Sequence, residues 1–359
     1  MKRKIIQLGG SAVVALPSPW LKEMNLGPGK EVSLSVLNDR LIVGRTEADA
    51  TPIPYHRFDK TNVRTISAIV YAHYLGGRDG VTVEVPVVSS ETYDHLEELC
   101  GKLSGASLYR HETNPQLILR FTDVQGKSIL SSLDRCFNIL NRMCLANLEL
   151  LGRSYRDEER LETNKRTIMA DEDELDRTKT YILRLLNKAL YDPEFFYQTD
   201  IGDKRNVVQY GRIAAHAERL ADLQEEIVGH LVRNYRDFIK NERIDFRPAS
   251  KKLERMYLTC FNLVQRAHRC IRDPNESCQL VGLGKLDQQG GISYVEGIVE
   301  RTQRESLFQF FLNRYSKCPE FLPEITILQS KIYAMASIAL NIAECSANIQ
   351  LSAGSGTQQ

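Results

Sequence analysis

Two pairs of carboxylates, each with its members four residues apart, give this chain its clearest chemical signal. The pairs are Glu172 with Asp176 and Glu218 with Asp222. Residues four apart share one face of a helix, where two like charges repel each other by a few tenths of a kcal/mol. A divalent cation relieves that repulsion, because such ions accept carboxylate oxygens as ligands. If the two helices pack side by side, the four carboxylates converge at their seam. The sequence therefore predicts a carboxylate metal site.

Each pair also has a plainer interpretation. Glu172 stands in the acidic run Asp171–Glu174, and such runs usually form a solvated helix face. Arg219 lies between Glu218 and Asp222, where it can pair with either acid and account for both. Acids on separate outward-facing surfaces would leave an ordinary helical scaffold, whereas a metal site needs them in one groove.

An internal repeat favours the metal interpretation. The segment Cys136–Arg142 (CFNILNR) returns 124 residues later as Cys260–Arg266 (CFNLVQR). The acids Glu172 and Asp176 return at the same offset, and Asp222 returns 122 residues later. A period this long indicates duplicated domains rather than a solenoid of short repeats. The matching acids of the second copy are Glu296, Glu300 and Glu344.

Glu344 is the only charged residue between Ile332 and Leu351. A carboxylate on such an apolar helix is costly to bury unless it is neutralised or ligated. A metal ion and a polar helix seam account for it about equally well. The position that corresponds to Glu218 is Leu340, so the second copy lacks one acid and we expect it to bind metal weakly or not at all.

The elements that must position these acids are long helices. Apolar residues at three- and four-residue spacing run from Leu133 to Leu151, and the helical pattern continues beyond them. We expect a mixed, mainly α protein with two three-helix units, 123–235 and 248–352, joined by a basic segment around Asn241–Lys252. The tail, 353–359, is small and polar and is predicted to be disordered. Residues 49–122 are predicted to form a small α+β module, with helices over 63–74 and 92–103 and strands near 81–85, 107–109 and 117–121.

These motifs resemble those of the PhoU domain. The resemblance lies in the Glu-x-x-x-Asp spacing of one helix, the sequence Glu218–Asp222 (ERLAD) of the next, and the duplicated three-helix unit, and it covers about 123–352. It implies clusters of divalent or trivalent metal ions, such as iron, zinc, manganese or nickel. It also implies regulation of phosphate uptake together with a phosphate-specific ABC transporter. The family's metal positions fall on Glu172, Asp176, Glu218, Asp222, Glu296, Glu300 and Glu344.

Residues 1–48 are predicted to form a small β unit, with strands over 12–16, 32–36 and 40–43 and a short helix over 20–26. Fewer than 50 residues bury too little surface to be stable alone, so we expect association. The order of elements resembles the AbrB-type swapped-hairpin domain, in which two chains interleave into one barrel that usually binds DNA. That resemblance implies a homodimer. An AbrB-type unit ahead of PhoU repeats resembles the arrangement in archaeal PhoU homologues.

Basic residues near the N-terminus favour a DNA contact, because a two-fold axis would double them into a phosphate-binding patch. They are Lys2, Arg3, Lys4 and Lys22. Two departures oppose it: AbrB-type DNA binders carry an arginine and an Arg-Arg pair where this chain has Val13 and Leu21–Lys22. Two functions remain open. One is a DNA-binding regulator, and the other is an adaptor that docks on the ATPase of a phosphate-specific ABC transporter, with the barrel serving only for dimerisation.

Composition and missing motifs argue against several other classes of function. Lys plus Arg (47) nearly equals Asp plus Glu (46), so nucleic-acid binding needs a local patch rather than bulk charge. There is no apolar run of membrane-spanning length, no signal pattern and no C-x-x-C pair among the eight cysteines, so we expect a cytoplasmic protein with reduced thiols. A di-metal oxidase needs histidine three residues after each lead acid, and the residues there are Leu175, Ala221, Val299 and Ala347. We therefore expect a protein that is not an enzyme.

Overall fold

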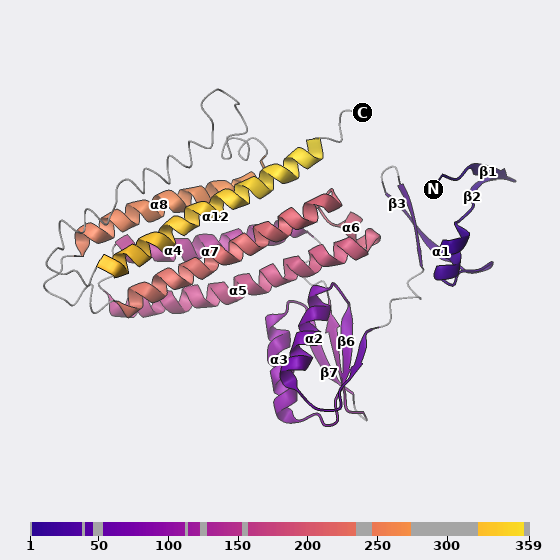
Figure 1. Ribbon diagram of the computed structural model, residues 1–359, viewed down its shortest axis with the longest axis horizontal. Coiled ribbons are helices and arrows are strands. Elements are labelled where there is room, and N and C mark those ends of the chain that lie inside the picture. Colours follow the sequence, from indigo (N-terminus) through magenta and orange to yellow (C-terminus); the bar gives the residue numbers. More distant parts are fainter. Residues whose placement is uncertain are drawn as a thin grey trace. The chain divides into compact units, whose positions relative to one another are not determined.

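The computed structural model describes residues 2–37, 40–45, 53–111, 114–122, 128–152, 157–234, 246–273 and 322–354. It is mainly helical with a few small sheets, as predicted. The chain divides into two compact units, Met1–Ile53 and Pro54–Gln359 (Figure 1). We describe each unit by itself.

The N-terminal unit consists of two antiparallel hairpins and one short helix. Strands β1 (Ile5–Leu8) and β2 (Ser11–Val14) form the first hairpin, α1 (Ser18–Glu23) follows, and β3 (Val32–Leu37) pairs with β4 (Arg40–Arg45). The turn of the first hairpin places Gly9 at φ 61°, a conformation that glycine adopts without strain. Strand β1 was not predicted, because it has only four residues and its apolar side chains face solvent. The strand predicted over 12–16 ends two residues later than β2 does.

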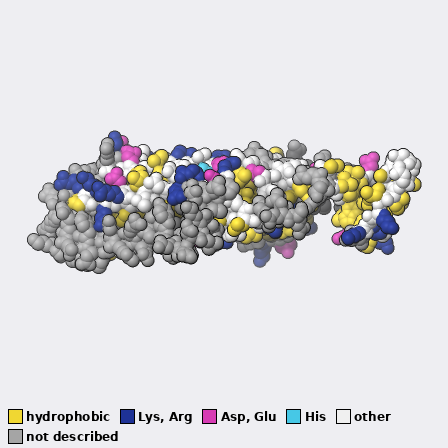
Figure 2. Space-filling model, turned by 90° about the horizontal axis from the view of Figure 1, so that it is seen from above, with side chains coloured by type: hydrophobic (Ala, Val, Ile, Leu, Met, Phe, Trp, Pro, Cys, Tyr) yellow, Lys and Arg dark blue, Asp and Glu magenta, His cyan; other side chains and the backbone are white. Residues whose placement is uncertain are grey.

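The described part of this unit buries no side chain. Among the described residues, every buried hydrophobic side chain lies at Ile66 or beyond, whereas Ile5, Leu8 and Val36 are 74%, 69% and 78% exposed. Figure 2 shows hydrophobic side chains on the surface of the N-terminal unit. Exposure of so many aliphatic side chains is unfavourable in water, so the unit as described lacks a core of its own.

The second unit begins with a four-stranded sheet covered on one face by two helices. Its elements are β5 (Tyr55–Arg57), α2 (Val63–Leu75), β6 (Gly80–Glu84), α3 (Ser90–Lys102), β7 (Ala106–Arg110) and β8 (Gln116–Phe121). The strand order is β5-β6-β8-β7, with β5 parallel to β6 and the other pairs antiparallel. The side chains of Asn62 and Ser89 cap α2 and α3 by accepting the amides of Thr65 and Thr92. Strand β5 was not predicted; it has three residues and directly follows Pro54.

The rest of the second unit is a bundle of long helices (Figure 1). They are α4 (Ile129–Gly152), α5 (Glu158–Tyr191), the short α6 (Pro193–Gln198), a 3₁₀ turn (Lys204–Asn206), α7 (Val207–Arg233), α8 (Arg247–Cys270) and α12 (Leu322–Gly354). One hydrophobic core runs through all the long helices. The basic joining segment was predicted too long, because α8 already begins at Arg247 with Pro248 in its first turn, a favourable position for proline. The middle helix predicted for the second copy lies outside the described residues.

Helix α12 is long and apolar enough to cross a membrane by length and composition, over Leu322–Ser352. It packs against both α7 and α8, and the core includes Ile332, Ile342 and Ile349 from it. It also reaches Gly354, so the predicted tail starts two residues too early; 355–359 lie outside the described residues.

Polar contacts fix α7 against its neighbours at the level of the acids. Asn147 of α4 donates its amide to the carbonyl and the side-chain oxygen of Gln224, at 2.9 and 3.1 Å, and Tyr257 of α8 donates its hydroxyl to the same side chain. All three side chains are fully buried, where hydrogen bonds are costly to break. Since Gln224 lies two residues after Asp222, this contact sets the rotation and height of the helix that carries the second acidic pair.

A buried arginine attaches the sheet module to the bundle. Arg184 of α5 is fully buried and donates to the carbonyl oxygens of Tyr74 (3.2 Å) and Arg78 (2.5 Å) at the end of α2. Four residues further along α5, Lys188 pairs with Asp79 at 2.8 Å. One helix therefore carries both an acidic pair and the attachment of the module.

Candidate metal centre

The two acidic pairs face one another across the contact between α5 and α7. Asp157 starts α5 by accepting the amide of Arg160 at 3.2 Å, and the helix then continues for 34 residues, so Glu172 and Asp176 lie in its middle. Glu218 and Asp222 occupy the middle of α7, which packs along α5. All four acidic side chains are half-buried. We call these four residues the acidic seam.

Glu172, at one end of the acidic seam, is repelled by neighbouring carboxylates. The pKa of Glu172 is raised to about 7, first by burial and then by the negative charges of Asp176, Glu225, Asp173 and Asp222. Glu225 is a further half-buried acid on α7, three residues after Asp222. A carboxyl group with such a pKa holds a proton near neutrality unless a cation replaces that proton.

The other half of the acidic seam, formed by Asp176 and Glu218, contains a cation, Lys179. Lys179 places Nζ 2.6 Å from Oε1 of Glu218, and its side chain is 17% exposed. The pKa of Asp176 is raised chiefly by burial; Lys179 opposes that rise, and the acids Glu218 and Asp222 add to it. Oδ1 of Asp176 is buried and accepts no hydrogen bond from the described residues. One lysine thus offsets part of the charge of this half.

The acidic run Asp171–Glu174 divides between two helices. Asp171 and Glu174 turn toward α4, where Arg142 contacts them at 2.6 and 3.2 Å and Arg135 contacts Glu174 at 2.9 Å. Asp173 is exposed to solvent. Only Glu172 of this run faces α7, so the solvated-face interpretation describes Asp173 alone.

Arg219 pairs with only one of the two acids beside it. Its Nη1 lies 3.2 Å from Asp222 and 3.3 Å from Glu226, and Glu226 also pairs with Lys331 of α12. Glu218 is left to Lys179. Arg219 is about half exposed, so its ion pair with Asp222 is screened and weak.

The acids of the second copy do not form a described site. Glu296 and Glu300 lie outside the described residues. Glu344 is exposed rather than buried on α12, so the expected cost of burying it does not arise. The hydrophobic side of α12 faces α7 and α8, and Glu344 stands on another side of the helix. Burial lowers the pKa of His216 of α7, and the nearby charge of Glu344 opposes that lowering. Leu340, which replaces an acid, packs at the core instead.

The seam residues match the donor chemistry of a carboxylate metal site, but they are not already arranged as one. Within the described part of the chain, no three carboxylate, imidazole or thiolate groups are placed to hold an ion as they stand. Oδ1 of Asp176 is buried without a hydrogen bond from the described residues, and the raised pKa of Glu172 indicates a carboxylate that a cation would stabilise. Glu172, Asp176, Glu218 and Asp222 are the residues that would hold the ion.

Two members of this region were missed in the sequence. Lys179 stands three residues after Asp176, a spacing that places a cation beside an acid on one helix face. Glu225 stands three residues after Asp222. The first signal was readable, but which acid the lysine would select depended on how α7 packs.

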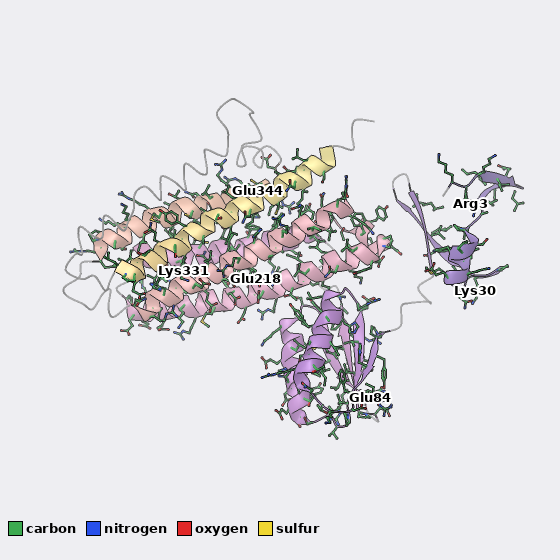
Figure 3. The ribbon with its side chains drawn as sticks, in the orientation of Figure 1. Arg3, Lys30, Glu84, Glu218, Lys331 and Glu344 are labelled. Carbon is green, nitrogen blue, oxygen red and sulfur yellow. The ribbon has the colours of Figure 1, made fainter. Side chains whose placement is uncertain are left out.

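The predicted DNA contacts all lie in the N-terminal unit. Lys2, Arg3 and Lys4 precede β1, and Lys22 lies in the last turn of α1; all four are exposed. Figure 3 labels Arg3 and Lys30 of this unit. Exposure makes these charges available to phosphates, but the same is true of any surface lysine. The four residues of one unit alone do not form a patch.

Cysteines contribute no described ligand. Cys100, Cys136, Cys144, Cys260, Cys270 and Cys345 are free and buried, while Cys278 and Cys318 lie outside the described residues. Burial raises the pKa of the Cys136, Cys144 and Cys260 thiols to about 12, which keeps them protonated.

No known family model, curated protein or solved structure matches the chain.

Proposed function

We propose that this protein is a cytoplasmic, non-enzymatic regulator of phosphate uptake whose acidic seam binds a divalent or trivalent metal ion. The convergence of Glu172, Asp176, Glu218 and Asp222 across α5 and α7 carries the proposal. The link to phosphate comes from the resemblance of these motifs, and of the duplicated three-helix unit, to PhoU domains. In this proposal the two tandem helical units are PhoU-like and the N-terminal unit is AbrB-like.

The electrostatics of the acidic seam favour cation binding. Four acids raise the pKa of Glu172 besides its burial, and one lysine is the main compensating charge. A bound ion would replace the proton on Glu172 and occupy the unpaired oxygen of Asp176. The ammonium of Lys179 competes with the ion for Glu218, so metal affinity includes the cost of displacing it.

Metal content tests this proposal directly. The full chain, purified without chelator, is analysed for iron, zinc, manganese and nickel, and then titrated with each ion after chelator treatment. We expect bound metal in the wild type and its loss in Glu218→Ala with Asp222→Ala. A matched control is Glu159→Ala with Glu162→Ala, which removes two exposed acids from the first turns of α5. Equal metal content in the wild type and the Glu218/Asp222 variant would eliminate the site.

The N-terminal unit decides between the two forms of regulation. Its exposed Ile5, Leu8, Leu34 and Val36 require a partner surface, and a second copy of the unit supplies one in the AbrB-like arrangement. We propose a homodimer held by this unit. As a DNA-binding regulator it would contact phosphates through Lys2, Arg3, Lys4 and Lys22; as an adaptor it would only hold two bundles together on a transporter ATPase.

Duplex binding separates these forms. We expect the DNA-binding form to retain a promoter-length duplex at moderate salt and to lose it when the four basic residues become alanine. An adaptor binds no duplex even at low salt. In cells, both forms require the acidic seam, so phosphate uptake should lose its response to external phosphate in the Glu218/Asp222 variant. An unchanged response would contradict the proposed function whatever the result with DNA.

A further inference from the structure

Among the described residues of the second unit, helices cover one face of the sheet of the α+β module, and the other face carries exposed side chains. Helices α2 and α3 pack on the face that carries Val81, Val83, Leu117 and Leu119, all fully buried. Side chains alternate along a strand, and residues directly opposite on neighbouring strands share a face. The other face is therefore built from the residues between these, and the strand register gives its composition.

A continuous row of four side chains crosses this face. Tyr55 of β5 lies opposite Thr82 of β6, Thr82 opposite Ile118 of β8, and Ile118 opposite Tyr109 of β7. Tyr55 and Tyr109, on the two edge strands, are 51% and 55% exposed. Three strand spacings separate them, about 14 Å at the usual distance between strands. The row is an apolar strip with one aromatic ring at each end.

Tyr55 is held by a neighbouring strand. Its hydroxyl donates to the carboxylate of Glu84, which lies on β6 two residues beyond Thr82, the direct partner of Tyr55. Glu84, labelled in Figure 3, also accepts from Gln116 at 2.9 Å and pairs with Arg57 at 3.4 Å. Tyr55 is 51% exposed while it makes this hydrogen bond, so much of its surface is open to a ligand. The three donors also satisfy the one carboxylate among the described side chains of this face.

Arginines accompany both rings. Arg57 lies two residues after Tyr55, on the same face, and its side chain is 73% exposed. Arg120 is exposed and lies opposite Ser107, one diagonal step from Tyr109. Each end of the strip thus combines an exposed aromatic ring with a guanidinium group, which binds phosphate oxygens and stacks on planar rings.

We infer that this face, formed by Tyr55, Arg57, Ile118, Tyr109 and Arg120, binds single-stranded nucleic acid. Stacking needs exposed ring faces, and single strands offer unpaired bases to a sheet that carries aromatic side chains with basic neighbours. A B-form duplex presents no free base faces, and its grooves admit a helix or a two-stranded ribbon rather than a four-stranded sheet. The described face carries two arginines and one glutamate, so its net charge is small. Stacking of bases on the two tyrosine rings, rather than net charge, therefore selects the ligand.

A binding assay with the full chain tests the inference. The probes are a fluorescein-labelled 12-nucleotide oligo(U) and oligo(dT), with a mixed-sequence duplex for comparison, measured by fluorescence anisotropy in chelator and about 50 mM salt. The background is the Lys2/Arg3/Lys4/Lys22→Ala variant, so binding by the N-terminal unit does not contribute. We expect single-strand binding there, and at least a 30-fold loss in Tyr55→Ala with Tyr109→Ala, the low end for two stacked bases.

Three controls make the outcome decisive. Tyr109→Phe keeps the ring and should retain binding, and Tyr191→Ala removes a 79% exposed tyrosine at the end of α5 and should have no effect. Thermal melts establish that the double variant is folded. Absence of single-strand binding, an equal affinity for duplex, or an equal loss in Tyr191→Ala overturns the inference. So does a change of sedimentation mass in the double variant, which would make this face a contact between two copies of the chain. None of these results bears on the metal proposal.

Discussion

Replacing Glu172 by glutamine should stabilise the metal-free protein at alkaline pH. The pKa of this carboxyl rises from 4.5 to about 7 because of burial and of neighbouring acids, Asp176 first. A shift of this size corresponds to about 3 kcal/mol at full strength. Solvent screening at a half-exposed side chain reduces it to about 1–2 kcal/mol. Glutamine keeps the shape and removes the charge, so the variant should gain that amount.

The sign follows from proton binding. With a raised pKa, the folded state holds a proton that the unfolded chain has already released, so wild-type stability falls as pH rises from about 4.5 to about 7. Above about 7 the full penalty remains. The glutamine variant does not titrate there, so its advantage should be complete at pH 8 and absent at pH 4.5.

Urea unfolding in chelator, followed by circular dichroism at pH 8 and pH 4.5, measures this difference. Glu162→Gln, an exposed acid on the same helix, is the matched control and should change stability by less than about 0.5 kcal/mol. A Glu172→Gln variant that is less stable than wild type at pH 8 would refute the reasoning. An equal gain at both pH values would refute it as well, since repulsion vanishes once the carboxyl is protonated.

Added metal should reverse the order of the two proteins. Wild type gains stability by mass action as the ion binds the folded state, whereas the glutamine variant has lost one ligand and gains less. If metal leaves wild type unchanged while the pH effect persists, the acidic seam is a site of repulsion without an ion. The two parts of the reasoning therefore fail separately.

Three further predictions concern the contacts around the acidic seam and the module. Lys179→Met should bind metal about tenfold more tightly, since no ammonium competes for the seam, while losing about 1 kcal/mol of stability in chelator; titration calorimetry and urea unfolding measure both, and unchanged affinity would count against competition. Arg184→Met should destabilise the protein by about 2–4 kcal/mol, because it removes the guanidinium hydrogen bonds to the carbonyl oxygens of Tyr74 and Arg78. Thermal unfolding tests this, and a loss below about 1 kcal/mol would contradict it. His73 has a pKa lowered by burial, by His56 at 2.7 Å and by Arg78, so the unfolded chain takes up its proton first and α2 should lose hydrogen-exchange protection as pH falls below about 6.5; constant protection down to pH 5.5 would refute this.

Periodic patterns made the helices predictable, but not their contacts. The apolar spacing of Leu133–Leu151 predicted α4, and the four-residue spacing of the acids predicted that each pair shares a helix face. Helix ends were harder to predict: Pro248 was assigned to the joining segment, whereas it lies in the first turn of α8. The strands β1 and β5 escaped prediction because three or four residues with exposed side chains carry no alternation that distinguishes a strand from a loop.

The candidate site shows the same limit at the level of single side chains. The sequence grouped Asp171–Glu174 as one run, yet their positions around the helix send Asp171 and Glu174 to arginines of α4 and Glu172 to α7. Which neighbour lies on each side of α5 is a property of the whole bundle. The expectation for Glu344 was wrong for a related reason: an apolar helix was taken as buried on all sides, whereas α12 exposes the side that carries this acid.

Lys179 connects the acidic seam with the sheet module. It pairs with Glu218 on one side, and on the other it lies close enough to Tyr71 of α2 for the two to interact electrostatically. Five residues later on the same helix, Arg184 holds the end of α2 by its carbonyl oxygens. A cation that enters the seam competes first with the ammonium of Lys179, so the shortest physical route from the seam to the module runs through this side chain. Any dependence of module contacts on metal should therefore disappear in Lys179→Met, while Arg184 keeps the module attached.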